Sequence, residues 1–315
     1  MKNRVHAPNS LRVALSEQVV IADGAMGTML QNAQPSLEDF QGYEGCNEIL
    51  NVTRPELVAQ IHRKYFESGV DAVETNTFGA NLANLGEYGI SDRIYELSLA
   101  GALIAREVAN EFNKSKGSPK WVLGSMGPGT KLPTLGHVTY AELKQAYALS
   151  AKGLIDGGAD ALLIETTQDL LQAKAAVNGA RESIANAQRD VVLIAQVTVE
   201  TTGTMLLGSE IGAALNALQA LGVDLIGMNC ATGPSEMSEH LRTLSQSSNV
   251  GISCMPNAGL PILKDGGAYY PLSPEELAKA LAQFVSDYRV NLVGGCCGTT
   301  PEHLAAVVKL LHGKK

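Results

Sequence analysis

The 315-residue sequence lacks the features that mark membrane, secreted and nucleic-acid-binding proteins. It has no run of about 18 apolar residues, which a membrane-spanning helix needs, and no apolar stretch of a signal peptide near its amino terminus. The 24 basic side chains are outnumbered by 32 acidic ones, and the net charge of −8 disfavours nucleic acid or an anionic membrane as a partner. Five cysteines are too few, and odd in number, for a secreted disulfide framework. We therefore expect a cytoplasmic protein with free thiols.

Glycine is abundant, whereas aromatic residues are scarce. The chain contains 32 glycines, while Phe, Trp and Tyr together make up 5% of it. Apolar residues make up 45%, which is enough for a core and excludes disorder as a description of the whole chain. The composition predicts a folded protein with many tight turns and little aromatic stacking surface.

Short, continuously apolar segments alternate with amphipathic segments along the chain. Strands that are buried on both faces have this continuous hydrophobicity, so the pattern predicts a parallel sheet covered by helices. The eight predicted strands are Val19–Asp23, Asp71–Thr75, Trp121–Ser125, Ala159–Glu165, Val191–Val197, Val223–Asn229, Val250–Cys254 and Asn291–Gly294. Eight such units in about 300 residues favour an α/β fold of the (β/α)8 TIM-barrel type over an open doubly wound sheet. We place the barrel at residues 17–315, after an N-terminal extension of residues 1–16.

Three copies of a short repeat precede predicted strands: Gly69-Val-Asp71, Gly158-Ala-Asp160 and Gly222-Val-Asp224. Glycine suits the first position because the residue that follows a helix is commonly left-handed. The residues seven positions after these glycines are polar, and they are Asn76, Glu165 and Asn229. We therefore expect polar side chains at the carboxyl ends of three strands, where the active sites of (β/α)8 barrels lie. Long loops are predicted at the same end, at residues 24–52, 126–138, 198–209 and 255–272.

Three of the five cysteines are expected to meet. Cys230 directly follows the sixth predicted strand, and Cys296 and Cys297 directly follow the eighth, so all three face the same mouth of the barrel. Three thiolates with a fourth position open is the arrangement of a catalytic zinc site. From spacing alone, the set indicates either a metal site or redox-active thiols, with buried packing as the alternative. For Cys46 and Cys254 we expect packing.

The segments around these cysteines match known zinc-binding motifs, which here are Gly227-Met-Asn-Cys230 and Gly294-Gly-Cys-Cys-Gly-Thr-Thr-Pro-Glu-His303. With them the sequence resembles the homocysteine S-methyltransferase family over residues 17–310. Further matching segments are Asp23-Gly-Ala-Met-Gly-Thr28, Glu74-Thr-Asn-Thr-Phe-Gly-Ala80, Gly124-Ser-Met-Gly-Pro128 and Glu165-Thr-Thr-Gln-Asp169. Within the family the sequence looks most like the homocysteine-binding module of cobalamin-dependent methionine synthases, through Gly42-Tyr-Glu-Gly-Cys-Asn-Glu48 and Met255-Pro-Asn-Ala-Gly259.

The resemblance implies a zinc-dependent transfer of a methyl group to L-homocysteine, which gives L-methionine. Cys230, Cys296 and Cys297 would hold the Zn²⁺, and the substrate thiol would take the fourth position. A free thiol has a pKa near 8.5 and is mostly protonated at neutral pH, whereas a metal-bound thiol loses its proton. With four thiolates the centre would carry a net charge of −2, which keeps the substrate sulfur electron-rich. No nucleophile from the protein is needed.

The resemblance also implies which residues hold the amino acid part of the substrate. Glu165 would bind the amino group, and the loop of Asp23, Gly24 and Ala25 would help to hold the amino acid through its backbone N–H groups. A salt bridge at the rim is the alternative role for Glu165. The alternative for Asp23 is a cap of the following turn.

Three asparagines near strand ends complete the predicted site. Asn76 and Asn229 are expected to fix neighbouring backbone rather than to contact the substrate. Asn257, in the loop after the seventh strand, fits either role.

The methyl donor implied by the resemblance is methylcobalamin. It would be carried by a separate cobalamin-binding module and recharged from methyltetrahydrofolate on a further module, in cis or in trans. Neither module fits within 315 residues. S-methylmethionine, S-adenosylmethionine and betaine remain alternative donors, and another small thiol remains an alternative acceptor. A non-catalytic zinc-binding or thiol-sensing protein is the alternative of a different class. The glycine-rich loops do not complete a nucleotide-binding motif.

Overall fold

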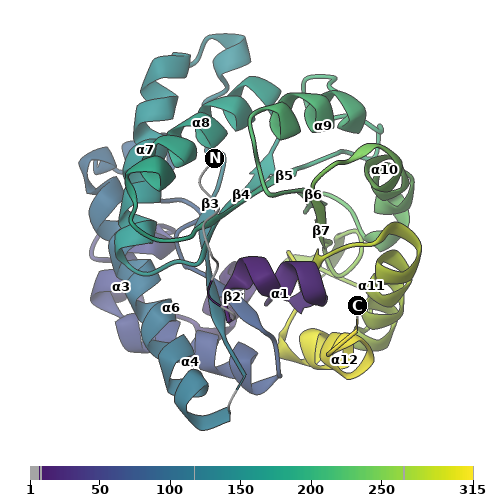
Figure 1. The fold of residues 1–315 in the computed structure, drawn as a ribbon. Coiled ribbons are helices and arrows are strands. Elements are labelled where there is room, and N and C mark those ends of the chain that lie inside the picture. The colour runs from purple at the N-terminus through teal and green to yellow at the C-terminus, as the bar shows by residue number, and fades with distance from the viewer. Residues whose placement is uncertain (1–6, 8, 117, 265–266, 315) are drawn as a thin grey trace.

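The computed structural model of the protein describes residues 7, 9–116, 118–264 and 267–314, and its centre is a barrel of eight parallel strands (Figure 1). The barrel strands are β1 (Val20–Ile21), β2 (Ala72–Glu74), β3 (Trp121–Met126), β4 (Ala161–Thr167), β5 (Val192–Val197), β6 (Leu225–Asn229), β7 (Gly251–Met255) and β10 (Leu292–Val293). Each lies within or next to a predicted strand, and the predicted (β/α)8 fold is confirmed.

Helices surround the barrel on all sides (Figure 1). The outer ring consists of α4 (Pro55–Glu67), α6 (Ile94–Lys116), α7 (Tyr140–Asp156), α8 (Leu170–Asn186), α9 (Ile211–Ala220), α10 (Pro234–Ser247), α11 (Pro274–Tyr288) and α12 (Pro301–Leu311). Shorter helices lie in the first two βα loops: α2 (Met26–Ala33), α3 (Leu50–Thr53) and α5 (Leu82–Glu87). Within the described residues, no helix has both the length and the apolar character needed to cross a membrane.

The barrel sheet is buried on both faces. Leu123, Leu163 and Ile194 belong to one buried cluster, which fills the inside of the barrel. Their neighbours Val122 and Leu162 belong to a second cluster, which packs between the sheet and the helices. Because side chains alternate between the two faces of a strand, both sets must be apolar, and this explains the continuous hydrophobicity of the strands.

The seam between β1 and β2 is the least regular part of the barrel. The strands follow the order β1-β10-β7-β6-β5-β4-β3-β2, so β1 and β2 are its two ends. The Asp71 amide donates to the Ile21 carbonyl (2.7 Å), and the Asp71 carboxylate accepts from the Ile21 amide (3.0 Å). At the other end of the seam, the Glu74 amide donates to Asp23 Oδ1 (3.0 Å). Side-chain carboxylates therefore complete a closure that strand pairing leaves unfinished.

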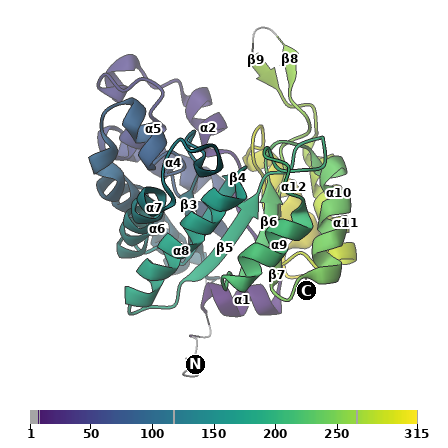
Figure 2. The same cartoon turned by 90° about the horizontal axis from the view of Figure 1, so that it is seen from above.

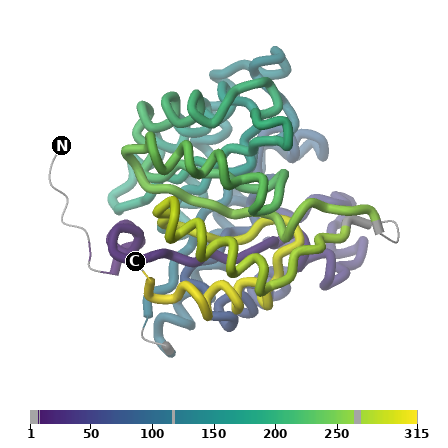
Figure 3. Tube along the Cα trace, turned by 90° about the vertical axis from the view of Figure 1, so that its right-hand side faces the viewer, coloured from purple at the N-terminus to yellow at the C-terminus, as the bar shows by residue number. Residues whose placement is uncertain are grey.

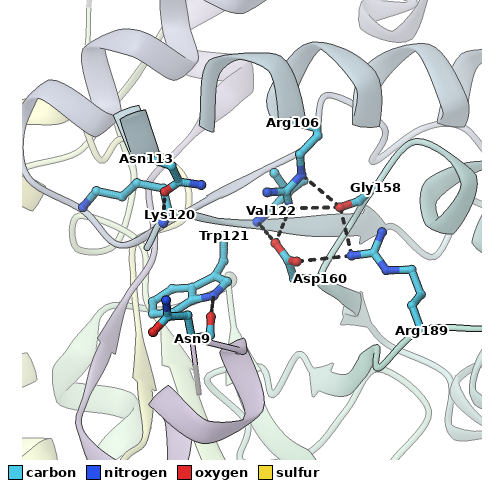
Figure 4. Close-up of polar contacts among 9 residues, drawn as sticks. All are labelled: Asn9, Arg106, Asn113, Lys120, Trp121, Val122, Gly158, Asp160 and Arg189. Carbon is cyan, nitrogen blue, oxygen red and sulfur yellow. Dashed lines mark hydrogen bonds and ion pairs between the residues drawn. The ribbon is translucent and has the colours of Figure 1, made fainter. Parts of the chain in front are cut away.

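The predicted glycine–aspartate repeat has a structural role, which Figure 4 shows for Asp160. The Asp160 amide donates to the Val122 carbonyl (2.8 Å), and its carboxylate accepts from the Val122 amide (2.9 Å). Arg106 and Arg189 both bind this carboxylate and the Gly158 carbonyl. The preceding glycines of the repeat have φ of +101°, +98° and +79°, as a left-handed helix end requires. The same two-bond clamp joins Asp71 to Ile21, Asp224 to Leu193 and Asn291 to Ile252.

Helix α1 (Leu11–Glu17) covers the amino end of the barrel (Figures 1 and 2). Its Leu11 and Leu15 are buried in the cluster that fills the barrel interior. The predicted extension, residues 1–16, therefore includes a helix that packs as part of the barrel. Residues 1–6 and 8 of that extension, and Lys315, lie outside the described residues.

One element was not expected from the sequence. The loop after β7 contains an antiparallel hairpin of β8 (Ile262–Lys264) and β9 (Gly267–Tyr269). Figure 2 shows it projecting from the carboxyl end of the barrel, on the side opposite α1. Its segments of three residues are too short to give a periodic signal.

A buried histidine makes the stability of the fold depend on pH. His62 on α4 is fully buried, and neither of its ring nitrogens has a hydrogen-bond partner among the described residues. Burial lowers the pKa of His62 to about 3, whereas the pKa in the unfolded chain is about 6.5. Between these values the unfolded chain binds more protons, so the stability present above pH 6.5 is lost as the pH falls. The expected slope is about 1.4 kcal/mol per pH unit.

We predict that His62→Leu removes this dependence. Relative to the variant, the unmodified protein should lose about 2 kcal/mol of unfolding free energy between pH 7 and pH 5. Urea denaturation of both proteins at the two pH values measures the difference. If the two proteins differ in unfolding free energy by the same amount at pH 7 and at pH 5, His62 is not the source of the pH dependence.

Candidate metal centre and substrate pocket

A cavity of about 230 Å³ opens at the carboxyl end of the barrel strands. Most of the predicted site residues line it: Gly24, Ala25, Asn76, Glu165, Asn229, Cys230, Cys296 and Cys297. Asp23 and Asn257 are buried next to lining residues. The structure therefore brings the predicted residues together from the carboxyl ends of six barrel strands and the loops that follow them.

The three cysteine sulfurs lie at the distances that a tetrahedral metal ion requires. Cys297 Sγ is 3.8 Å from Cys230 Sγ and 4.0 Å from Cys296 Sγ, and all three sulfurs lie within 4.8 Å of one another. Thiolates bound to Zn²⁺ at about 2.3 Å in a tetrahedron are separated by about 3.8 Å. The donor set and its spacing fit this ion.

Unusual backbone conformations aim these sulfurs at one point. Cys230 has a φ of +60°, which is uncommon for a residue other than glycine. Gly298 has a φ of +78°, and a Cβ there would lie 2.2 Å from the Tyr270 ring. The Cys296 amide donates to the Pro256 carbonyl (2.8 Å), which ties the loop after β10 to the loop after β7.

Asn257 supports the loop that carries Cys296 and Cys297. Its Oδ1 accepts a hydrogen bond from the Cys297 amide (3.1 Å), and the neighbouring Ala258 amide donates to the Cys297 carbonyl (3.0 Å). Asn257 does not line the cavity. Of the two roles considered for it, these contacts favour backbone support.

Asn229 connects the sulfurs to the carboxylate of Glu165. Its Nδ2 lies 3.3 Å from Glu165 Oε2 and 3.9 Å from Cys296 Sγ, and its Oδ1 accepts from the Thr166 amide (2.7 Å). Asn76 holds the loop after β1, since its Nδ2 donates to the Asn47 carbonyl (2.8 Å). Both contacts agree with supporting roles.

The sulfur cluster favours a cation. Among the described residues, no Lys, Arg or His lines the cavity. Hydrogen bonds from Cys230 and Cys296 lower the pKa of Cys297 to about 3, whereas hydrogen bonds with its two partners raise the pKa of Cys296. The thiols alone thus stabilise one thiolate, and ionisation of all three needs a bound metal.

Three carboxyl groups, those of Asp23, Glu74 and Glu165, lie together in the other polar part of the site, and Glu48 also lines the cavity. Burial raises the pKa of Glu165 to about 7, and burial also raises the pKa values of Glu74 and Asp23. The Ser125 hydroxyl donates to Glu165 Oε1 (2.5 Å), while Asp23 Oδ2 has no hydrogen-bond partner among the described residues. Such a group of buried acids, with no basic residue lining the cavity, suits a cationic ligand.

Glu74 was missed as a candidate residue. It begins the segment Glu74-Thr-Asn-Thr-Phe-Gly-Ala80 and is the last residue of β2, and Glu165 lies near the end of β4. Its position at a strand end could have marked it as a site residue. Only the structure shows that Glu74 and Glu165 line the same cavity and raise or lower one another's pKa, because the two residues are far apart in the sequence.

The first turn of α2 offers backbone donors to the cavity. Met26, Gly27 and Thr28 line the cavity, and the N-cap residue Ala25 provides no side-chain cap. The first N–H groups of a helix have no partner within the helix and favour an anion. The Ala25 amide itself donates to Thr299 Oγ1 (3.2 Å), so the free donors lie just after the predicted loop.

Cys46 and Cys254 are buried apart from this cluster. Cys46 Sγ lies 3.7 Å from Glu48, and Cys254 Sγ lies 3.8 Å from Met237 Sδ. Both belong to the core cluster outside the barrel sheet, as expected for packing.

A family model described as homocysteine S-methyltransferase matches residues 20–311. The match covers nearly the whole barrel, together with the three cysteines and the carboxyl groups. The chain belongs to the homocysteine S-methyltransferase family.

Two methionine synthases and one solved structure are similar to this chain over most of its length. A methionine synthase of Mycobacterium tuberculosis is 62% identical over 93% of this chain, and a methionine synthase of Mycobacterium leprae is 59% identical over 97%. The matches cover 24% and 25% of those proteins, so the chain spans about a quarter of their length. The metallated form of the homocysteine methyltransferase MmuM from Escherichia coli has a TM-score of 0.76 and 23% identity, and the match covers 94% of this chain and 98% of that one. This likeness shows the barrel fold.

We predict that Gly298→Ala lowers the affinity for Zn²⁺ about tenfold or more, since the added Cβ would displace Tyr270 or the cysteine loop. Competition with a chromophoric chelator measures the affinity. Gly89→Ala is the matched control, because Gly89 has a φ of +72° with no atom within 4 Å of the added Cβ. The control should lose about 1 kcal/mol of stability and keep its affinity. Equal affinities in the two variants would contradict the prediction.

Proposed function

We propose that this protein transfers a methyl group to the thiol of L-homocysteine, activated at a Zn²⁺ held by Cys230, Cys296 and Cys297, and releases L-methionine. The observation that carries the proposal is the presence of a three-thiol cluster and a group of buried carboxyls in one cavity. The first suits a thiol activated by a metal, and the second suits an ammonium group. An amino acid with a terminal thiol presents both.

The three cysteines fix the position of the reacting sulfur. Their sulfurs lie within 4.8 Å of one another at the edge of the cavity, and the three cysteines would hold the Zn²⁺ there. A bound Zn²⁺ would lower the pKa of the substrate thiol, so that its sulfur is a nucleophilic thiolate. The neutral thioether of the product is a poorer ligand than a thiolate, which favours release.

The remaining polar groups orient the amino acid. Glu165 and Glu74 line the cavity, with Asp23 buried beside them, and the charge of an ammonium group would favour their ionised forms. The N-terminus of α2 offers N–H groups to the carboxylate. Asn229 contacts both Glu165 and Cys296, so the amino-binding and sulfur-binding parts of the site share one support. This arrangement holds the side-chain sulfur over the cysteines.

Methylcobalamin on a separate protein module is the donor that we propose, following the resemblance of the sequence, and the length of the relatives leaves room for such a module. The relatives are named methionine synthase, and three quarters of their length lies outside the match. A cobalamin-binding module and a methyltetrahydrofolate-binding module would act with the barrel in cis or in trans. S-methylmethionine, S-adenosylmethionine and betaine are the alternative donors, and assays with each donor and with free methylcobalamin distinguish them. A thiol sensor without transfer activity has no need of the three carboxyls.

We predict that Cys297→Ala loses both bound Zn²⁺ and the formation of methionine from homocysteine, because two thiolates cannot hold the ion in place. Metal analysis and a methionine assay measure the two properties. Cys254→Ala is the control, since Cys254 is buried away from the cavity, and it should keep both. Methyl transfer that persists after the loss of zinc would refute the mechanism.

We predict that Glu165→Gln raises the KM for homocysteine about ten- to a hundredfold, the range expected for loss of a hydrogen bond between charged groups. The zinc content should not change, because Glu165 is not a ligand. Glu142→Gln, at an exposed N-terminal position of α7 where glutamine can also cap the helix, should keep the KM of the unmodified protein. An unaltered KM in the Glu165 variant would remove Glu165 from the substrate site.

A further inference from the structure

The hairpin of β8 and β9 presents apolar side chains to solvent on both of its faces. Ile262 and Tyr269 pair across the hairpin and share one face, with exposures of 50% and 46%. Leu263 points to the other face and is 85% exposed. A two-stranded hairpin by itself is marginally stable in water, so covering these side chains would stabilise it.

Other exposed apolar side chains lie at the same end of the barrel. Among the described residues, those in the βα loops include Leu37 (66%), Phe78 (40%), Leu135 (54%) and Leu206 (52%). Only Phe78 of these four lines the cavity, so a small substrate in the cavity leaves the others uncovered. This distribution indicates contact with a macromolecule at the carboxyl end.

The base of the hairpin touches the metal-binding loop. Tyr270, which directly follows β9, packs its ring against Gly298, the residue after Cys297. A protein that sits on the hairpin is therefore next to the mouth of the cavity. Figures 2 and 3 show the hairpin extending from this end of the barrel.

We propose that the hairpin surface, formed by Leu260, Ile262, Leu263 and Tyr269, is the docking site for the protein domain that carries the methyl donor. The proposal rests on the proposed function. The matched relatives are about four times as long as the region that this chain covers, which leaves room for such a domain. Helix α1 covers the amino end of the barrel, so a donor reaches the sulfur site from the side of the hairpin.

The test uses the full chain and, as the probe, the part of the M. tuberculosis methionine synthase that the chain does not match, with methylcobalamin added. Leu263→Ser should weaken binding of the probe, measured by calorimetry, about tenfold or more, as for a central apolar contact residue. It should lower kcat/KM with the probe-bound donor by a similar factor. Activity with free methylcobalamin should not change, because Leu263 does not line the cavity.

Leu103→Ser is the matched control, since Leu103 is 51% exposed on α6 in the outer ring. It should bind the probe like the unmodified chain. Unchanged binding by Leu263→Ser, or an equal loss in both variants, overturns the docking site. A dimer of this chain that Leu263→Ser dissociates, seen by sedimentation, identifies a second copy as the occupant and also overturns it. If Leu263→Ser alone loses probe binding but the unmodified chain forms no methionine, the docking site is supported. The same result contradicts the proposed function.

Discussion

Three cysteine sulfurs are held within one site in which the thiols alone stabilise a single thiolate, and the organisation of this cavity depends on that constraint. Cys297 Sγ lies 3.8 Å from Cys230 Sγ and 4.0 Å from Cys296 Sγ, and no basic residue lines the cavity among those described. A left-handed backbone at Cys230 and the hydrogen bond from the Cys297 amide to Asn257 hold the sulfurs in place. A divalent cation would favour ionisation of the other two thiols.

The same cavity holds a second acidic group, and one residue connects it to the sulfurs. Glu165 lies near the end of β4, and Asn229 contacts both this carboxyl group and Cys296. Under the proposed function, a bound Zn²⁺ would offset part of the charge of the thiolates, and the ammonium group of the substrate would offset the charge of the carboxyl groups when they ionise. The barrel permits this because it directs the ends of several strands towards one opening.

Much of this arrangement was predictable. The eight strands could be located because strands buried on both faces must be apolar throughout, and Cys230, Cys296 and Cys297 could be grouped because they follow two parallel strands. The hairpin of β8 and β9 was not predictable, since strands of three residues carry no periodic signal. Glu74 was not singled out as a site residue, because its role depends on its place beside Glu165, which is far from it in the sequence.

The sequence by itself determined the barrel, the left-handed glycines before three of its strands and the meeting of Cys230, Cys296 and Cys297, because these follow from local patterns along the chain. Only the tertiary structure decided that Asn257 supports Cys297, that α1 packs into the amino end of the barrel, and that the free N–H groups belong to α2 rather than to Ala25. The physical reason is that these contacts join segments far apart in the chain, and their geometry is fixed only when the barrel closes.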